Sequence, residues 1–399
     1  VKQGDPLAPI LFLFVMQAAM ETVTKVVGWP KKLEFLTRND GILHQRQVHD
    51  DITMAKSEPT HHFEIMEFWA SLHADDGGFM FDSRKDLEAA TTVLFQHFGK
   101  FGMKMHVGTN GMKSKTEAMY FPKYTNPDSR GGNTKDIEVK NEDGSMMGTV
   151  QFVKQFKYLG KIITTDLTDD VDINKRVNLA TGAFQALKAC FFTAKGISLR
   201  LKGRVYSSLI LSILLSGSEQ WKLDTAKIKK LNGFHNYCAN QMTGNNWKQQ
   251  SRQHIKMAEL HSRLDLLSIE SYVTAKTLSW LGHVARMPWN RDPRRLLTSI
   301  AFLPKERKLT PANVTHTFGH TIYNRHFTRI LNHPKIDDYP DIMDALSYKI
   351  DPPKLLIKFK TLIQETGDDF IIDSWFHIAL SRERWLIVLL HFAEHERSG

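Results

Sequence analysis

The sequence predicts an α+β protein, with an antiparallel sheet and its helices in the first part of the chain and mainly helices in the rest. Up to about residue 164, short apolar segments alternate with turn signals rich in Gly, Pro, Asn and Asp. From Asp170 almost to Met287, apolar residues instead recur at helical spacing. The 399 residues are 42% hydrophobic and 24% charged, an ordinary globular composition with room for two or three domains.

The composition also excludes several classes of protein. No stretch approaches the roughly 18 uncharged apolar residues of a membrane span, so no membrane partner is expected. The amino terminus does not resemble a signal peptide, because Gly4, Asp5 and Pro6 interrupt its start. Two cysteines cannot build a disulfide framework, which favours an intracellular protein, nuclear or cytoplasmic. The net charge of +10 and the pI near 9.3 suit a polyanionic partner.

The first part of the chain contains residues that mark where helices and strands begin. Pro6 and Pro9 suit the first turn of a helix, and Asp5 is placed to cap it. Residues 63–72 are expected to be extended and to lead into a tight turn with two acidic residues at its tip. Ser83 is expected to cap a helix that runs to about Phe101. The turn signals further predict strands at 33–36 and 42–48 that form a hairpin, a strand at 117–121, a long loop at 122–146 and a second strand pair at 150–164.

Glycines separate the predicted helices in the second part of the chain. Gly196, Gly217 and Gly244 separate predicted helices over 170–195, 198–216, 224–243 and 269–286. After Pro288 proline becomes frequent, and the chain ends in a predicted helix over 370–397 that is rich in Trp and Phe. No function follows from this last region.

The feature that carries chemistry is the pair Asp75 and Asp76, followed by Gly77 and Gly78. Adjacent carboxylates are costly to bring together unless a cation neutralises them, and Mg²⁺ prefers such hard oxygen ligands. Phosphoryl transfer by two metal ions uses this type of ligand. Taken alone, however, an Asp-Asp-Gly turn is more often a solvated hairpin.

The segments around this pair resemble, in order, those of non-LTR (LINE-like) retrotransposon reverse transcriptases. The resemblance covers residues 1 to about 297. The helix-start segment matches Gln3-Gly4-Asp5-Pro6-Leu7-Ala8-Pro9, and the acidic box matches His73-Ala74-Asp75-Asp76. Later matches are Phe101-Gly102-Met103-Lys104-Met105, Ser114-Lys115-Thr116-Glu117-Ala118-Met119, Phe156-Lys157-Tyr158-Leu159-Gly160, the segment from Lys195-Gly196-Ile197-Ser198 to Arg204-Val205-Tyr206, Leu214-Leu215-Ser216-Gly217-Ser218-Glu219-Gln220-Trp221 and Trp280-Leu281-Gly282-His283-Val284-Ala285-Arg286-Met287.

The resemblance implies a right-handed polymerase that copies RNA into DNA. It places a partial palm at 1–148, a primer-grip-like hairpin at 149–165, a helical thumb at 166–290 and a carboxy-terminal extension at 291–399. Its partners would be an RNA template, a DNA primer and deoxynucleoside triphosphates, and its cofactor Mg²⁺, with Mn²⁺ as an alternative. Its protein partners stay unknown.

The same resemblance assigns roles to individual residues. Asp75 and Asp76 would be the catalytic metal ligands, and Lys115 would approach the triphosphate leaving group. Residues of the first segment would hold template and incoming nucleotide: Gln3, Gly4 and Pro6. The hairpin would guide the primer end through Phe156, Tyr158, Leu159 and Gly160. Two assignments have a structural alternative. Lys115 would then be a surface lysine before a strand, and the hairpin would pack on the palm.

Two basic clusters in the helical region are placed to follow a nucleic-acid backbone without reading its sequence. The first comprises Lys195, Arg200, Lys202 and Arg204. The second comprises Lys222, Lys227, Lys229 and Lys230. The alternative is a pair of solvated helix faces.

The sequence departs from the family at two points. His73 stands where the family has Tyr or Phe, and the third palm carboxylate of the family would lie upstream of Gln3. The sequence therefore predicts an incomplete two-metal site. It leaves open a degenerate protein that binds nucleic acid without catalysis, and, well behind, a Mg²⁺-dependent phosphohydrolase. A metal role for His61 with His62, or for His391 with His395, is rejected because no third ligand is evident.

Overall fold

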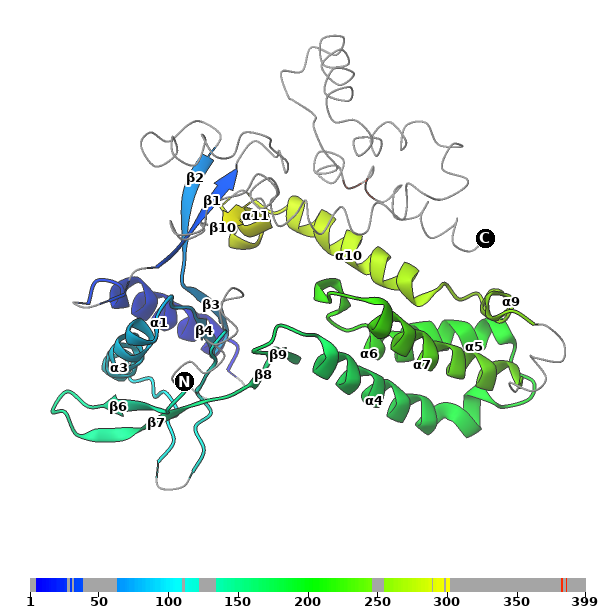
Figure 1. Cartoon of the computed structure of the whole chain (residues 1–399), viewed down its shortest axis with the longest axis horizontal. Coiled ribbons are helices and arrows are strands. Elements are labelled where there is room, and N and C mark those ends of the chain that lie inside the picture. Colours follow the sequence, from blue (N-terminus) through cyan, green and yellow to red (C-terminus); the bar gives the residue numbers. More distant parts are fainter. Residues whose placement is uncertain are drawn as a thin grey trace, which may run out of the picture. The chain divides into compact units, whose positions relative to one another are not determined.

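The computed structural model describes residues 5–26, 29–30, 32–38, 63–109, 112–121, 134–245, 255–288, 290–297 and 299–301, together with Arg382 and Trp385. The described part is α+β, as predicted (Figure 1). The chain divides into two compact units, Val1–Phe35 with Met66–Thr168 and Leu36–Ile65 with Asp169–Gly399. They are called the mixed unit and the helical unit below. No helix within the described residues is long and apolar enough to cross a membrane. The domain boundaries expected at residues 148 and 290 stay predictions.

Two helices and a hairpin form the first part of the mixed unit. Helix α1 (Ala8–Val23) packs on α3 (Arg84–Lys100), and the hairpin consists of β3 (Ala70–His73) and β4 (Asp76–Phe79). The predicted cap of α3 is confirmed, because the Ser83 hydroxyl accepts a hydrogen bond from the Asp86 amide at 3.1 Å. The small core between the helices is built from Ala19, Val23, Leu94 and Phe98.

A three-stranded sheet completes this unit. Its strands are β5 (Glu117–Ala118), β6 (Ile137–Lys140) and β7 (Met146–Phe152), in the order β5-β7-β6. The prediction of a loop throughout 122–146 is wrong over β6, where Ile137 and Val139 are buried and alternate with exposed residues. Four residues of alternation were too few to stand out beside Gly, Asn and Asp. The strand predicted at 117–121 is only two residues long.

The strand pair predicted at 150–164 proves to be parts of two sheets. Val150 lies in β7 and pairs with Ile137 of β6. The predicted hairpin is confirmed between β8 (Gln155–Tyr158) and β9 (Lys161–Thr164). A further small sheet has the order β10-β1-β2, formed by β1 (Leu33–Arg38), β2 (Phe63–Phe68) and β10 (Ser299–Ala301). The strand expected at 42–48 lies outside the described residues. Among the described strands, β1 pairs with β2 on one side and β10 on the other.

The helical unit follows the predicted helices closely. Its main helices are α4 (Asp170–Leu187), α5 (Leu199–Val205), α6 (Leu211–Leu214), α7 (Thr225–Thr243) and α10 (Ile269–Ala285). Two turns of π-helix, Lys188–Phe192 and Tyr206–Ile210, extend α4 and join α5 to α6. Two short helices were not predicted, α9 (Met257–Arg263) and α11 (Asp292–Leu297). Of the terminal helix expected over 370–397 only Arg382 and Trp385 are described, and both are helical.

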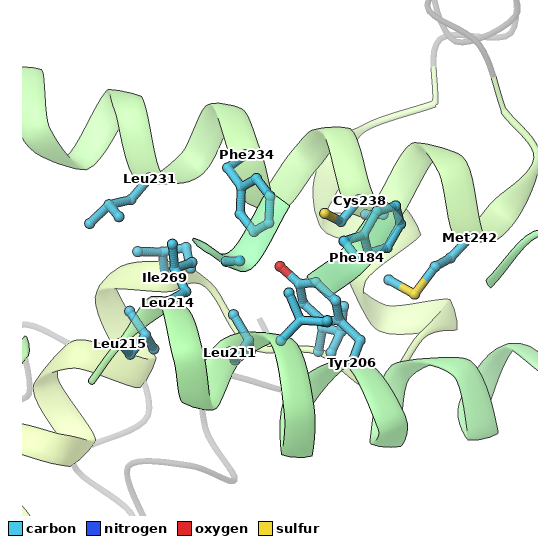
Figure 2. Packing of buried hydrophobic residues seen from close by; sticks show 14 of the residues in the cluster. Phe184, Tyr206, Leu211, Leu214, Leu215, Leu231, Phe234, Cys238, Met242 and Ile269 are labelled. Carbon is cyan, nitrogen blue, oxygen red and sulfur yellow. The ribbon is translucent and has the colours of Figure 1, made fainter. Parts of the chain in front are cut away.

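The core of the helical unit is one large apolar cluster (Figure 2). Phe184 of α4 stacks on Phe192 with ring centroids 4.6 Å apart and meets the edge of Tyr206. Apolar side chains from α6, α7 and α10 fill the remaining space: Leu211, Leu214, Leu231, Phe234, Cys238, Met242 and Ile269. Contacts of this kind stabilise the unit mainly by removing apolar surface from water.

His235 is a polar residue inside this core. Its Nε2 lies 3.1 Å from the carbonyl oxygen of Leu267, which can only accept, so Nε2 carries the proton and Nδ1 accepts from the Tyr206 hydroxyl at 2.9 Å. Burial, followed by the neighbouring His261, lowers the pKa of His235 to about 3. The residue is therefore a neutral connector between three segments of the core.

Candidate catalytic hairpin and basic surfaces

The two acidic residues lie at the tip of the β3–β4 hairpin, as predicted. His73 pairs with Asp76 across the two strands, which leaves Ala74 and Asp75 to form the turn. Ala74 adopts a positive φ of 53°, a conformation that non-glycine residues rarely take outside tight turns. Gly77 and Gly78 follow on β4 and add no side-chain bulk beside the carboxylates.

Aromatic residues hold this hairpin to the helices. Trp69 precedes β3 and packs edge-on against Trp29, with ring centroids 4.8 Å apart, and its ring lies 5.9 Å from that of Phe79. The carbonyl oxygen of Trp69 accepts a hydrogen bond from the Met80 amide at 2.8 Å. These rings pack on the core between α1 and α3. Sequence analysis did not single out Trp69 or Trp29, although aromatic residues flanking a strand are a recognisable anchoring signal.

The carboxylates of Asp75 and Asp76 are exposed to solvent. Two oxygen-rich side chains next to each other on a constrained turn fit the ligand preference of Mg²⁺ or Mn²⁺. Among the described residues no group of three or more His, Cys, Asp and Glu side chains could hold a metal ion. The hairpin thus supplies two candidate ligands.

An open pocket of about 440 Å³ lies beside the acidic turn. Leu72 and Ala74 of the hairpin line one side, and α1 lines the other with Leu13, Met16, Gln17, Met20 and Glu21. The amide of Gln17 donates to the Glu21 carboxylate at 2.5 Å. The acidic turn therefore borders a partly apolar hollow rather than a flat surface.

Helix α1 exposes a broad apolar face. At least two-fifths of the surface of each of these residues is accessible: Leu7, Ile10, Leu11, Leu13, Phe14 and Val15. A patch of this kind is typical of a surface that contacts another molecule or a further part of a longer protein. Pro6 lies in the turn before α1. The Asp5 carboxylate accepts a hydrogen bond from the Leu7 amide at 2.9 Å, but Leu7 is the N-cap of α1 and no side chain caps the helix, so the prediction that Asp5 caps it is wrong. Gln3 and Gly4 lie outside the described residues.

Lys115 is exposed in the loop before β5, and its amide donates to Nδ1 of His106 at 3.2 Å. The neighbouring Ser114 is buried and donates to the carbonyl oxygen of His106 at 2.9 Å. This loop is therefore held in place locally. None of the contacts found among the described residues joins Lys115 to the acidic turn.

The β8–β9 hairpin presents the residues expected at the primer end. Phe156 and Tyr158 lie on one face of β8, with rings stacked 6.5 Å apart. Leu159 and Gly160 form the two-residue turn, with φ of 46° and 84°. Positive φ at both positions matches a type I′ turn, and a leucine there costs of the order of 1 kcal/mol. Leu159 is also exposed, so this strained tip is accessible.

The first basic cluster is divided by the structure. Arg200 and Arg204 lie one turn apart on α5 and are exposed, as is Lys195 before the helix. Lys202 is instead buried, and its amine donates to the carbonyl oxygen of Met242 at 3.4 Å. Lys202 lies on the side of α5 that faces the core, opposite Arg200 and Arg204. Helical spacing in the sequence separates these two sides but does not tell that the lysine is on the buried one. We therefore remove Lys202 from the predicted backbone-binding set.

The second cluster is divided in the same way. Lys222, Lys229 and Lys230 are exposed. Lys227 is buried and bonds the Asp224 carboxylate at 2.8 Å, which raises the pKa of Lys227. It belongs to the amino-terminal end of α7 rather than to a nucleic-acid surface.

Several motifs that carry the resemblance have structural roles in the helical unit. Trp221 is buried, and its Nε1 donates to the buried carboxylate of Asp172 at 3.0 Å. Gly217, with φ of 80°, makes the turn that places it. Gly203 lies so close to Leu264 that a Cβ atom would overlap the Leu264 carbonyl group. These residues stabilise the fold.

Comparison with known proteins agrees with part of the resemblance. The chain is similar to an uncharacterized transposon-derived protein of Caenorhabditis elegans, with 25% identity over 145 residues. The match covers 36% of this chain and 51% of the relative, so the chain spans about half the length of that protein. No protein-family model matches the chain. The similarity indicates a transposon-related origin.

Proposed function

We propose that the chain carries part of the palm and the thumb of an RNA-directed DNA polymerase of a non-LTR retrotransposon. The observation that carries the proposal is the β3–β4 hairpin, whose tip exposes Asp75 and Asp76 while Trp69 and Phe79 fix its base. The transposon-derived relative supports the same origin. The order of the other motifs along the chain supports it further.

Asp75 and Asp76 would hold Mg²⁺ or Mn²⁺. Bound metal would lower the pKa of the primer 3′-hydroxyl and neutralise charge on the phosphates during nucleotidyl transfer. The chain's own contribution is two negatively charged ligands on a turn that Ala74 and the strand register keep in one conformation. Preorganised charge of this type stabilises a transition state without reorganisation cost.

The β8–β9 hairpin and the exposed cations suit the handling of primer and template. The stacked Phe156 and Tyr158 and the exposed Leu159 offer an apolar surface for the sugar and base of a primer end. Arg200, Arg204 and Lys195 are exposed and would bind phosphates without sequence preference, with Arg200 shared with the Asp265 carboxylate 3.6 Å away. Lys115, on its constrained loop, is proposed to face the leaving pyrophosphate.

A second candidate function is nucleic-acid binding without catalysis. The specific observation in its favour is that the described residues offer two candidate carboxylates but no cluster of three ligands. His73, in place of the aromatic residue of the family, points the same way. Both candidate functions use the basic surfaces, and only the first includes nucleotidyl transfer.

Primer extension separates them. The chain is incubated with Mg²⁺, thymidine triphosphate and an oligo(dT) primer on poly(rA), beside Asp75→Ala, Asp76→Ala and the control Asp82→Ala. Asp82 is an exposed aspartate just after the hairpin. A polymerase extends the primer in the wild type and in the control, and both hairpin variants lose at least about 100-fold, of the order expected for loss of a metal ligand. Salt-dependent binding without extension in any of the four proteins favours the second function.

A further inference from the structure

Three polar side chains meet on the surface where α7 packs beside α4 (Figure 1). Tyr237 of α7 is more than a third exposed. Its hydroxyl oxygen accepts hydrogen bonds from the Gln185 amide of α4 at 3.0 Å and from the Lys188 amine at 3.4 Å. The Lys188 amine also lies 5.8 Å from the centre of the Tyr237 ring, within the range of a cation–π interaction. Lys188 begins the π-helical turn that extends α4, and such turns are rare and often mark functional sites.

This group of side chains has more hydrogen-bond donors than acceptors. The phenol oxygen accepts from both Gln185 and Lys188, so its own O–H remains to donate outwards. An ammonium group has three N–H donors and a primary amide has two, so donors also remain on Lys188 and Gln185. None of the contacts found for Lys188 in the described part of the chain is with a carboxylate. An anion with several oxygen acceptors would therefore fit this surface.

Acidic residues are absent from most of the two helices. Between Ile173 and Ser218, and again between Thr225 and Ala258, the sequence has no Asp or Glu. The carboxylates that α4 and α7 do have stand at the helix starts, where the helix dipole favours them: Asp170, Asp172 and Asp224. A solvated helix face usually mixes both signs of charge along its length. The lack of acidic residues over the later turns is instead typical of a surface that binds a polyanion.

A second lysine bridges the same two helices. The amine of Lys230 on α7 bonds the side-chain oxygen of Asn174 on α4. Lys230 precedes Tyr237 by two turns of α7, which is about 10 Å along the helix axis. That length corresponds to about three nucleotides at the 3.4 Å spacing of a stacked strand. The positive charge of this surface therefore extends beyond a single lysine.

We propose that Gln185, Lys188 and Tyr237 bind a single-stranded nucleic acid, with Lys188 on a phosphate and the Tyr237 ring stacked on a base. Cations combined with exposed aromatic rings bind single strands in this way, with little sequence preference. Stacking requires an unpaired base, which favours a single strand over a duplex. The proposal rests on the nucleic-acid binding that both candidate functions include, but not on catalysis at the hairpin.

The test measures binding of a fluorescein-labelled single-stranded RNA by anisotropy over roughly 50 to 200 mM KCl, without nucleotide or Mg²⁺. The variants are Lys188→Gln and Tyr237→Leu. Two matched controls make the same changes in the mixed unit. Lys100→Gln alters a lysine whose amine pairs with the Glu142 carboxylate at 2.9 Å, and Phe121→Leu removes an exposed ring.

The two variants are expected to weaken binding in different ways. Lys188→Gln should lower the affinity about fivefold near 0.1 M salt and reduce the slope of log K against log salt by about 0.7, the value for one phosphate contact on a single strand. Tyr237→Leu should lower the affinity at least about fivefold and leave the slope unchanged, because stacking releases no counterion. Effects no larger than those of the controls overturn the proposal. A wild type that binds no RNA would overturn nucleic-acid binding as a whole.

A third variant separates stacking from packing of the helices. Tyr237→Phe keeps the ring and removes the hydroxyl, so it should bind RNA more tightly than Tyr237→Leu does. Equal losses in the two variants would overturn the stacking role. Hydrogen exchange of α4 and α7 shows whether both helices are still folded. If Tyr237→Leu unfolds them, Lys188→Gln decides the question, because Lys and Gln are similarly good helix formers.

Two competitors define the ligand. A duplex RNA of the same sequence is expected to displace the labelled strand less well than the unlabelled single strand, because its bases are paired. Poly-glutamate of equal charge is expected to displace it poorly, because it offers neither phosphates nor bases. Equal displacement by the duplex overturns the assignment of a single strand, and equal displacement by poly-glutamate overturns the assignment of a nucleic acid.

Discussion

The helical unit and the mixed unit are built in different ways. In the helical unit, side chains from α4, α6, α7 and α10 meet in one large core (Figure 2), and His235 is hydrogen-bonded inside it. The described part of the mixed unit has two small cores, several short strands and an apolar face of α1 open to solvent. Asp75 and Asp76 lie in the mixed unit, with both side chains exposed at the tip of the β3–β4 hairpin. Substitutions should therefore change stability in the helical unit and function in the mixed unit.

The largest effect is expected at Gly203. A Cβ atom there would overlap the backbone of Leu264, and backbone cannot move aside as a side chain can. Gly203→Ala should destabilise the helical unit by at least about 4 kcal/mol, the size of a severe core defect. Hydrogen exchange of peptides from α7 measures this.

The matched control is Gly233→Ala, in the interior of α7, where a Cβ atom meets nothing within 4 Å. It should stabilise the helix by about 0.5 to 1 kcal/mol. If both substitutions are tolerated equally, the close packing of α5 on Leu264 is wrong.

Acid should destabilise the helical unit through His235. Its pKa is about 3 in the folded protein, against an ordinary value of 6.5, so the unfolded chain binds more protons between those values. Stability from this residue is present above pH 6.5 and is lost as pH falls towards 3. The loss should reach about 3 kcal/mol between pH 7 and pH 4. His261, whose pKa burial also lowers, adds in the same direction.

Denaturant midpoints at a series of pH values measure the loss, and replacing half-buried His97 of the mixed unit by Gln serves as the control. The acid sensitivity should remain in the His97→Gln protein and diminish in His235→Gln. A flat profile for the helical unit would show that His235 is not held neutral.

A smaller effect is expected at Trp221. Trp221→Phe keeps most of the buried ring but removes the donor to the Asp172 carboxylate. The cost should be about 1 to 3 kcal/mol, that of a buried group losing one hydrogen bond. Thermal unfolding followed by circular dichroism measures it. Restoration of stability by adding Asp172→Asn would identify the carboxylate as the cause, whereas a neutral Trp221→Phe would contradict the account.

The smallest effect on stability is expected at the catalytic hairpin. Asp75→Asn and Asp76→Asn alter exposed side chains, so the unfolding free energy should change by less than about 0.5 kcal/mol. Removing one of two neighbouring negative charges could even stabilise the turn slightly. A loss of more than 2 kcal/mol in thermal unfolding would give the pair a structural role instead.

The sequence predicted these two units to different degrees. The long helices were predictable because helical periodicity extends over many residues, and the hairpins at Asp75 and at Leu159 because their turns are short and well marked. Strand β6 was missed because its four residues carry little signal. The burial of Lys202 and Lys227 could not be predicted, because a helix pattern does not tell which lysine reaches a distant carbonyl or carboxylate. The contact of Trp385 with Gly282 joins residues far apart in sequence, so helical periodicity could not predict it.

Metal binding at the hairpin tests the central claim most directly. Free Mn²⁺ is measured by electron paramagnetic resonance while the chain, bound to primer and template, is titrated against it. The account predicts Mn²⁺ bound by the wild type and by Asp82→Asn, but not by the variant that combines Asp75→Asn with Asp76→Asn. Equal binding by all three proteins would contradict the assignment of Asp75 and Asp76 as the metal ligands.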